Sequence, residues 1–258
     1  DYLAIGLDPT KSVIFKQSDV SAHTELAWIF DTIVTMPYLM RAHAYKDAEA
    51  KNKEINVGTF NYPVLMACDI LLYSPDVVPV GQDQKQHVEY ARDIAEKFNH
   101  IFCGDKSSEK GGVFKLPEPM ILKEVAVVPG LDGQKMSKSY NNTIPLFATR
   151  EEITKAVMSI VTDSGADIPP NVYNIHKLFR NAAELRALYE ANKGKYKALK
   201  EALIEDIDAF IKPLRERRAA IAADVGKVQA VLEEGAKKAN VIASKKLGEA
   251  KRAVGVSA

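Results

Sequence analysis

Residues 61–98 contain the feature that most constrains the fold, a buried helix followed by a buried strand. Residues 61–73 are apolar on nearly every side, which predicts a helix covered all round, with Pro63 in its first turn. After a Ser-Pro-Asp break, residues 77–80 predict a short buried strand, and residues 84–98 predict an amphipathic helix. Because helices that alternate with buried strands pack on the faces of a parallel sheet, this succession predicts an α/β fold.

The segments on either side extend the same alternation. Residues 12–15 and 125–128 predict two further short strands. A helix with Ser21 as its N-cap is predicted from four apolar residues on one face: Leu26, Ile29, Phe30 and Ile33. After residue 150 the strand signals stop, so we expect an α/β domain in residues 1–145 and an all-helical domain in residues 146–258.

The helical part contains two long amphipathic helices. The first is expected to be kinked or interrupted near Pro213, and its stripe is Tyr196, Leu199, Leu203, Ile207, Phe210, Ile211 and Leu214. The second stripe is Val228, Val231, Leu232, Ala239, Ile242 and Leu247. Residues 193–258 hold 15 Lys and Arg against 9 Asp and Glu, whereas residues 1–192 hold 20 against 25. A basic end of this kind suits a polyanion such as a nucleic acid, although solvated helix faces have the same composition.

Composition excludes several classes. With 47% hydrophobic and 27% charged residues the chain has the composition of an ordinary globular protein. It contains no run of ~18 consecutive apolar residues, so the sequence predicts no membrane span. The two cysteines, Cys68 and Cys103, form no CxxC pair, which argues against a metal site, and they fit a reducing cytosol. We therefore expect a cytoplasmic protein.

Asp69 lies in the middle of the apolar helix. A buried carboxylate is costly unless a hydrogen-bond donor or a cation pairs with it. A backbone N–H, a tyrosine hydroxyl or a lysine would make it a purely structural residue. Alternatively Asp69 faces a pocket and accepts a hydrogen bond from a ligand, with Met66 one turn earlier giving an apolar contact.

The turn after the predicted strand of residues 77–80 is a second candidate site. Ligands of open α/β sheets bind beyond the carboxyl ends of strands, where a glycine allows close approach and a helix offers free N–H groups. Gly81 is therefore a candidate for contact with a nucleotide, and Asp83 is available to a hydroxyl or an ammonium group. The alternative is that Asp83 only caps the helix of residues 84–98.

The third candidate is a lysine loop, residues 131–142. It contains the pentapeptide Lys135-Met136-Ser137-Lys138-Ser139. The two lysines could contact a phosphate chain from two sides, and the two serine hydroxyls could donate further hydrogen bonds. A solvated basic turn is the ordinary interpretation of two lysines at this spacing. The exact order of the five residues argues against it.

That pentapeptide is identical to the KMSKS signature of class I aminoacyl-tRNA synthetases. Residues 58–73 and 78–87 closely resemble the bacterial-type tryptophanyl-tRNA synthetase family, and residues 17–30, residues 163–166 and the closing helices are similar to it as well. The resemblance covers essentially the whole chain. It implies a Rossmann-like nucleotide-binding domain followed by a helical domain that binds tRNA at or near the anticodon.

The resemblance also implies an amino acid site. Asp69 would accept the indole N–H of L-tryptophan, and a buried acceptor left unpaired by a wrong ligand discriminates strongly. Met66, Val78 and Val80 would line the indole slot, and Gln84 would hold the amino acid end of the substrate.

The nucleotide site follows from the same resemblance. Gly81, Gln82 and Asp83 would contact ATP, and Lys135, Met136, Ser137, Lys138 and Ser139 would close over its triphosphate together with Mg²⁺. The carboxylate of tryptophan would attack the α-phosphorus, and the terminal ribose of tRNA(Trp) would then attack the adenylate. No protein nucleophile is required. Lys138, and secondarily Lys135, would be catalytic by neutralising the departing pyrophosphate. The family further implies a homodimer.

Two departures from the family pattern stand out. The early His-x-Gly-His or His-x-Gly-Asn signature is absent, since no histidine is followed by x-Gly, and the first strand of the fold is missing too. We therefore expect an N-terminally truncated chain that is inactive by itself. Ala48 stands where the family often has a second lysine, which leaves Lys46 alone as a candidate phosphate contact.

Two rival functions remain at this point. Tyrosyl-tRNA synthetase shares the fold and the lysine loop, but it typically has a glutamine at the position of Met66. A non-catalytic RNA-binding paralogue would have no need of Asp69, Gly81 and an intact lysine loop together. Both rivals are less consistent with the sequence than a tryptophan–tRNA ligase.

Overall fold

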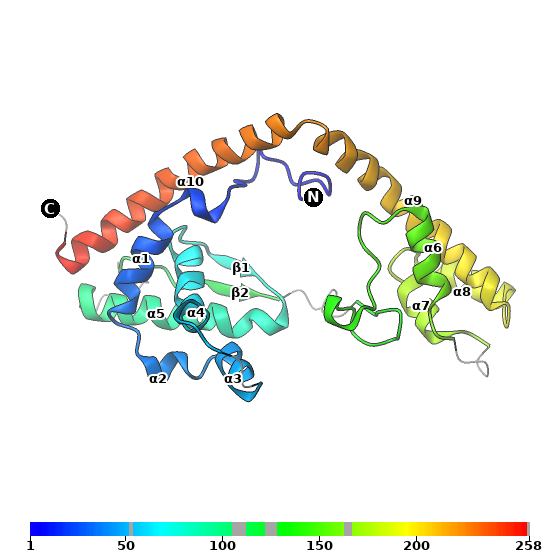
Figure 1. Ribbon diagram of the computed structural model, residues 1–258, viewed down its shortest axis with the longest axis horizontal. Coiled ribbons are helices and arrows are strands. Elements are labelled where there is room, and N and C mark those ends of the chain that lie inside the picture. Colours follow the sequence, from blue (N-terminus) through cyan, green and yellow to red (C-terminus); the bar gives the residue numbers. More distant parts are fainter. Residues whose placement is uncertain (52–53, 105–111, 122–127, 163–166, 257–258) are drawn as a thin grey trace. The chain divides into compact units, whose positions relative to one another are not determined.

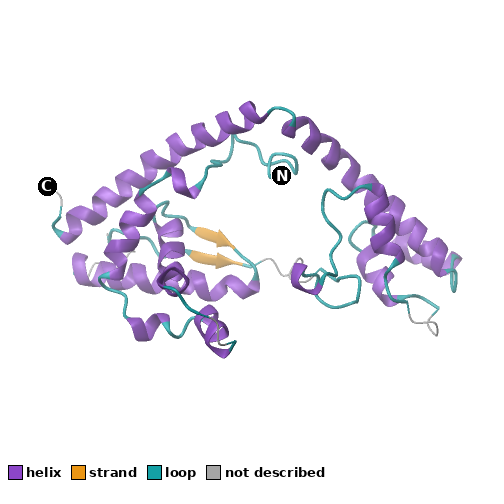
Figure 2. Cartoon of the chain, viewed as in Figure 1, coloured by secondary structure: helices purple, strands orange, loops and turns teal. Residues whose placement is uncertain are grey.

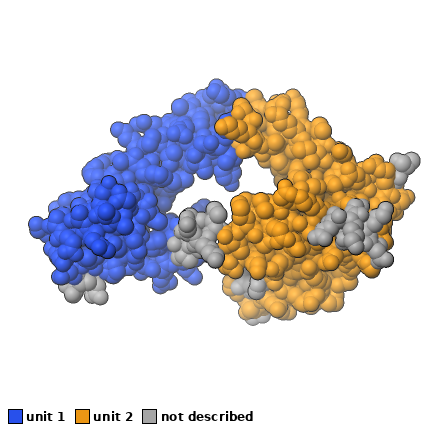
Figure 3. Space-filling view, turned by 180° about the vertical axis from the view of Figure 1, so that it is seen from behind, with its two compact units in different colours: residues 1–8, 127–228 blue, residues 9–126, 229–258 orange. Residues whose placement is uncertain are grey.

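The computed structural model describes residues 1–51, 54–104, 112–121, 128–162 and 167–256, and these form two compact units. Unit 1 comprises residues 1–8 and 127–228, and unit 2 comprises residues 9–126 and 229–258 (Figure 3). The expected boundary at residues 145 and 146 differs from this division, which places residues 127–145 in unit 1 and residues 229–258 in unit 2, where the last helix packs into the core. The functions expected for the two domains stay predictions.

Unit 2 is an α/β unit with a short parallel sheet (Figures 1 and 2). Strand β1 pairs with β2 so that Val78 lies opposite Pro119. The elements of this unit are η1 (Gln17–Asp19), α1 (Ala22–Asp31), α2 (Met36–Leu39), α3 (His43–Ala50), α4 (Val57–Leu71), β1 (Val77–Pro79), η2 (Gln82–Gln84), α5 (Lys85–Cys103), β2 (Glu118–Met120) and most of α10 (Val225–Val254). A parallel sheet covered by helices confirms the predicted fold class.

The core of unit 2 forms where α1, α4, α5 and α10 meet. The amphipathic helix predicted for residues 84–98 is α5, and its apolar stripe is buried in full, with Val88, Ala91, Ile94, Ala95 and Phe98 each at most 2% exposed. Helix α4 begins at Val57 rather than at residue 61, because Asn56 caps it by accepting the Thr59 N–H at 2.8 Å. Pro63 is therefore inside the helix, where its buried ring packs on the core.

Two predicted strands have different outcomes. Residues 12–15 are irregular instead of a strand, and the structure places the carbonyl of Ile14 against α10 rather than beside a neighbouring strand. Residues 125–127 lie outside the described part of the chain, and Val128 is not in a strand. Strand β2 was not predicted, because it is only three residues long and contains a proline.

Unit 1 is helical in its described part and has two small cores. Its elements are η5 (Lys138–Tyr140), α6 (Arg150–Met158), α7 (Pro170–His176), α8 (Ala182–Ala191) and α9 (Tyr196–Ala222). The larger core joins α6, α7 and α9, and the smaller one joins α8 to the start of α9. A capping box between Thr149 and Glu152 starts α6.

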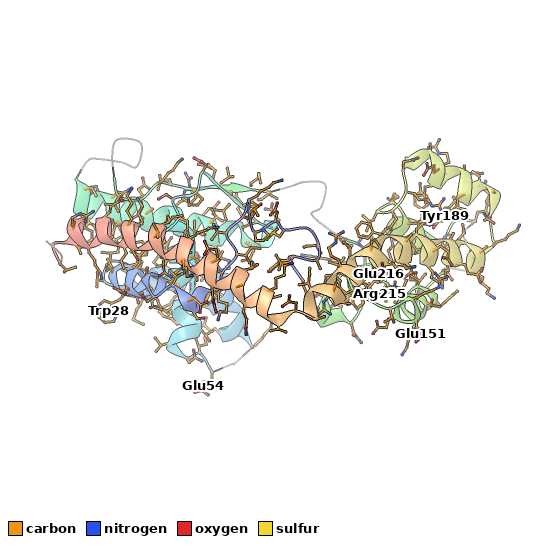
Figure 4. The ribbon with its side chains drawn as sticks, turned by 90° about the horizontal axis from the view of Figure 1, so that it is seen from above. Trp28, Glu54, Glu151, Tyr189, Arg215 and Glu216 are labelled. Atoms are coloured by element: carbon orange, nitrogen blue, oxygen red, sulfur yellow. The ribbon has the colours of Figure 1, made fainter. Side chains whose placement is uncertain are left out.

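Helix α9 is not interrupted at Pro213, so the expected interruption is wrong, whereas a kink at this residue stays a prediction. Arg215, labelled in Figure 4, lies just after the proline. It spans the proline by donating a hydrogen bond to Asp208 at 3.0 Å, and it also donates to the carbonyl of Ala148. Leu199, Leu203, Ile207 and Ile211 are buried as predicted, whereas Phe210 is exposed. Packing and this bridge therefore hold the helix across the hydrogen bond that a proline cannot make.

The buried face of α10 differs from the predicted stripe. Of the six predicted residues only Ala239 and Leu247 are buried, and Ile242 is 47% exposed. The buried face consists of Gly235, Ala236, Ala239, Ala243, Leu247 and Ala250. Small side chains are buried here because they allow the helix backbone to lie directly against the rest of unit 2.

Candidate functional site

Asp69 lies near the C-terminal end of α4, and two side chains hold its carboxylate. Gln17 Nε2 donates to both carboxylate oxygens, at 2.7 Å to Oδ1 and 2.8 Å to Oδ2. His23 Nδ1 lies 2.5 Å from Oδ1. The Asp69 side chain keeps 36% of its surface exposed, so it is anchored without being enclosed.

The hydrogen bonds of His23 define its tautomer. The carboxylate can only accept, so Nδ1 carries a proton. Nε2 lies 2.7 Å from the Tyr73 hydroxyl, and in the neutral ring it accepts a hydrogen bond from that hydroxyl. Burial and, secondarily, the charge of Asp69 raise the pKa of Tyr73 to about 12, which keeps this donor protonated.

The anchoring leaves Asp69 with unused acceptor capacity. A carboxylate has about four lone-pair positions, of which Gln17 and His23 together use three. The partners are an amide and an imidazole rather than the backbone N–H, tyrosine hydroxyl or lysine considered from the sequence. The sequence could have pointed to His23 as a partner, because His23 lies on the buried face of α1 together with Leu26 and Phe30.

The residues expected to line the indole slot lie in the same unit as Asp69. Met66 is one turn before Asp69 on α4, and Met66 and Val78 are both partly buried and pack against the core of unit 2. Val80 lies just beyond β1, where its N–H donates to the carbonyl of Met120 at 3.1 Å. Because side chains alternate along a strand, Val78 and Val80 share one face.

Gln84 is oriented by a chain of hydrogen bonds that the sequence did not predict. Its Oε1 accepts from His87 Nδ1 at 2.9 Å, and His87 Nε2 lies 3.0 Å from the Tyr62 hydroxyl. The amide oxygen requires the proton on Nδ1, so in the neutral ring Nε2 accepts from Tyr62. Tyr62 is on α4, and burial raises its pKa, which preserves the donor.

The turn after β1 is the 3-10 helix η2, which leads directly into α5. Gly81 has φ −69° and ψ 160°, so it is extended and is not in the left-handed region. Gly81 and Gln82 are exposed. The side chain of Asp83 lies outside the described part of the structure, and the N-cap residue of α5 is Gln84.

The lysine loop is organised by Asn142, which is 3% exposed. Its Oδ1 accepts the Ser137 N–H at 2.7 Å, and its Nδ2 donates to Asp132 Oδ1 at 2.8 Å and to the Lys135 carbonyl at 3.1 Å. The hydrogen bond from Asn142 lowers the pKa of Asp132. One buried amide therefore ties both ends of the loop to its centre.

This arrangement leaves the two lysines exposed to solvent. Lys135 forms an isolated bridge with Pro129, Met136 donates its N–H to the Val128 carbonyl at 2.8 Å, and Lys138 begins η5. The side chain of Ser139 is outside the described part. Lys46 is exposed on α3.

The structure thus groups the predicted residues by unit. Met66, Asp69, Val78, Val80 and the turn at Gly81 belong to unit 2, and the lysine loop belongs to unit 1. In the described ranges no group of three or more His, Cys, Asp or Glu could hold a metal ion. None of the helices in those ranges combines the length and apolar composition needed to cross a membrane.

Comparison with known proteins relates this arrangement to a family. The model of the family described as tRNA synthetases class I (W and Y) matches residues 1–223. The chain is 48% identical over 264 residues to the tryptophan–tRNA ligase of Fusobacterium nucleatum, covering 99% of this chain and 79% of that protein. It is 42% identical to the tryptophan–tRNA ligase of Rhodopirellula baltica, covering 99% of this chain and 80% of that one.

Solved structures agree with these relatives. The crystal structure of Campylobacter jejuni tryptophanyl-tRNA synthetase complexed with ADP and tryptophan matches with a TM-score of 0.88 and 41% identity, covering 98% of this chain and 80% of that one. Tyrosyl-tRNA synthetase from Archaeoglobus fulgidus has a TM-score of 0.54 at 20% identity, which shows a shared fold alone. This chain therefore belongs to the class I tRNA synthetases for tryptophan and tyrosine, and within them to the tryptophan–tRNA ligases.

Proposed function

We propose that the protein activates L-tryptophan with ATP and transfers it to tRNA(Trp). The observation that carries this proposal is the Asp69 carboxylate, which Gln17 and His23 hold in one orientation with acceptor capacity left over. An anchored acceptor of this kind suits a ligand with a single N–H donor at the end of an apolar ring system, which describes the indole of tryptophan. The names of the relatives support tryptophan over tyrosine.

In the proposed complex Asp69 accepts the indole N–H, and Met66, Val78 and Val80 contact the faces of the ring. A phenylalanine side chain would leave the remaining acceptor position of the anchored carboxylate desolvated and unpaired, which accounts for discrimination. Gln84 holds the amino acid end of the substrate, and the chain from Tyr62 through His87 fixes the direction of its amide.

In the proposed activation step an oxygen of the tryptophan carboxylate bonds to the α-phosphorus of ATP, and the bond from that phosphorus to the bridging oxygen breaks. Pyrophosphate leaves with the electron pair, and the adenylate remains. In the second step a ribose hydroxyl of the tRNA terminus attacks the carbonyl carbon, and AMP leaves. Lys138 and Lys135 stabilise the charge that develops on the pyrophosphate.

ATP is expected to contact Gly81, Gln82 and Asp83 through its ribose and phosphates, with Met136, Ser137 and Ser139 completing the lysine loop. We expect Mg²⁺ to bind mainly through the phosphate oxygens of ATP, as is usual for this ion. The role of Lys46 as a further phosphate contact belongs to the same proposal.

We assign tRNA binding to the helical part of the chain, residues 146–258. The excess of Lys and Arg over Asp and Glu after residue 193 supports this assignment, because phosphate contacts dominate the affinity for nucleic acids. A nitrocellulose filter assay that shows no salt-dependent binding of tRNA(Trp) would argue against it.

We further propose a homodimer in the cytoplasm. Trp28 is 73% exposed on α1 (Figure 4) and lines a pocket of about 290 Å³ together with Tyr62 and Leu65 of α4. An exposed tryptophan beside an apolar pocket is typical of a protein interface. Sedimentation equilibrium should show a dimer that Trp28→Glu weakens, and a monomeric wild type would refute the proposal.

Amino-acid-dependent ATP–pyrophosphate exchange by the full-length protein tests the main proposal. We expect exchange with tryptophan and none with tyrosine. Asp69→Ala should raise the KM for tryptophan and reduce selectivity while the KM for ATP changes little. Exchange with tyrosine alone would show that the protein is a tyrosyl-tRNA synthetase instead. Exchange with no amino acid would refute the proposed synthetase function.

A further inference from the structure

Gln17, which holds Asp69, lies in a segment with little regular structure of its own. It begins η1, a 3-10 helix of three residues, and residues 13–16 before it are irregular. A single 3-10 turn has poor hydrogen-bond geometry and does not persist by itself. Gln17 is also solvent-exposed, so its side chain is not held by burial. Phe15 and Val20 pack into the core of unit 2 on either side of Gln17, and one further element holds the backbone from which Gln17 reaches Asp69.

That element is α10, which contacts the segment on both sides of Gln17. Asn240 Nδ2 donates to the carbonyl of Asp19 at 2.9 Å, across 221 positions of sequence. On the other side, Gly235 lies so close to Ile14 that a Cβ on the glycine would be 1.9 Å from the Ile14 carbonyl oxygen. Figure 1 shows the segment before α1 alongside α10.

Helix α10 is itself firmly seated in unit 2. Ala239, Ala243, Leu247 and Ala250 belong to the same core as α1 and α4, which carry His23 and Asp69. Lys251 also forms an ion pair with Glu25 of α1 at 2.5 Å. Because α10 is fixed in the core, its contacts hold the backbone on either side of Gln17 in one position.

We propose that Asn240 and Gly235 are positioning residues for the reading of the indole N–H. They hold residues 14–19 so that the Gln17 amide occupies one position on each oxygen of Asp69 and leaves an acceptor position for the ligand. The inference rests on the proposed function, and it makes the C-terminal helix part of the specificity for tryptophan.

The test compares tryptophan with β-(3-benzothienyl)alanine, in which sulfur replaces the indole N–H and the rest of the shape is kept. The readout is the ratio of kcat/KM for the two amino acids in ATP–pyrophosphate exchange by the full-length protein. Asn240→Ala and Gln17→Ala should each reduce this ratio about tenfold, because the acceptor is no longer held in place. The KM for ATP should not change.

The matched control is Lys246→Ala. Lys246 also ties α10 to the rest of unit 2, by donating to the carbonyl of Val113 at 2.8 Å, and its hydrogen bonds in the described structure go to Val113 and Glu249 rather than to residues 14–19. A loosened α10 should lower the melting temperature in both Lys246→Ala and Asn240→Ala, whereas the ratio should fall only in Asn240→Ala. Gly235→Ala gives a second variant that displaces Ile14 and leaves the amide of Asn240 intact.

A double mutant separates positioning from general damage. If Asn240 acts through Gln17, the Gln17→Ala/Asn240→Ala protein should have the same ratio as Gln17→Ala alone. An unchanged ratio in both Asn240→Ala and Gly235→Ala, with a reduced ratio in Gln17→Ala, would overturn the role of α10 and leave the proposed function intact. An unchanged ratio in Asp69→Ala would instead overturn the assignment of Asp69 as the indole acceptor.

Discussion

Lys138 is the residue whose removal should separate catalysis from binding. Its charge is proposed to act on the departing pyrophosphate, an interaction that strengthens only as the bond to the α-phosphorus breaks. Lys138→Ala should therefore lower kcat about 10²- to 10³-fold and leave the KM for tryptophan nearly unchanged.

Steady-state ATP–pyrophosphate exchange measures both constants for Lys138→Ala. Lys155→Ala is the control, because Lys155 is an exposed lysine of the same unit on α6. A parallel loss of tryptophan affinity in Lys138→Ala would show that Lys138 contacts the amino acid rather than the phosphates.

Asn142 is the residue that should matter most for the shape of the lysine loop. Asn142→Ala removes the partners of the Ser137 N–H, of Asp132 and of the Lys135 carbonyl. We expect faster hydrogen exchange at the Ser137 amide and a lower kcat, because the lysines lose their fixed backbone. Asn141→Gly is the control, since Asn141 is exposed and has φ 55°, which glycine adopts freely. Unchanged exchange at Ser137 in Asn142→Ala would contradict this role.

Helix α10 offers a comparison between two glycines on one element. A Cβ at Gly235 would meet the backbone of Ile14 at 1.9 Å, whereas a Cβ at Gly248 would meet only the flexible end of Arg252 at 3.6 Å. Gly235→Ala should lower the free energy of unfolding by about 1 to 3 kcal/mol through overpacking. Gly248→Ala should raise it by about 0.5 to 1 kcal/mol, because alanine favours the helix. Urea denaturation checks both, and equal effects would refute the close contact.

At the scale of elements, the sequence predicted helices well where one face is apolar throughout. The stripe of α5 is buried as predicted, and α9 is buried along most of its predicted face. Periodicity predicted only two of the six residues on the buried face of α10, because it gives weight to large apolar residues and this helix packs mainly through glycine and alanine. The predicted start of α4 at residue 61 was also wrong. Pro63 was taken to mark the first turn, whereas the N-cap that begins the helix is Asn56.

At the scale of the whole molecule, each unit has its own core, and unit 1 also has a buried polar network. In unit 1 the network centres on His176, which is fully buried, with Nε2 2.6 Å from Asp206 and Nδ1 3.2 Å from the Tyr189 hydroxyl. Arg180 Nη2 donates to the other oxygen of Asp206 at 2.9 Å. Burial lowers the pKa of His176 below its ordinary value, even though Asp206 acts in the opposite direction.

This network predicts a pH dependence of stability. Below an ordinary histidine pKa of 6.5 the unfolded chain binds a proton that folded His176 does not. The stabilisation is therefore complete above pH 6.5 and is lost as the pH falls through the lowered folded pKa. Burial alone would raise the pKa of Asp206, but the hydrogen bonds from Arg180 and His176 lower it, so Asp206 contributes only at still more acidic pH.

Urea denaturation between about pH 7.5 and about pH 5 measures this loss. His176→Gln should flatten the dependence relative to the wild type, whereas the exposed His100→Gln should leave it unchanged. An equally steep dependence in His176→Gln would assign the titration to other groups.

The sequence by itself determined the fold class and the family, and it predicted the residues of the candidate site. Those properties reside in local patterns, such as an apolar helix that contains one carboxylate and a pentapeptide of fixed order. The tertiary structure decided what holds those residues. Gln17, His23 and Asn240 act on partners 46 to 221 positions away that only folding brings near, and a hydrogen bond over such a separation leaves no periodic trace in the chain.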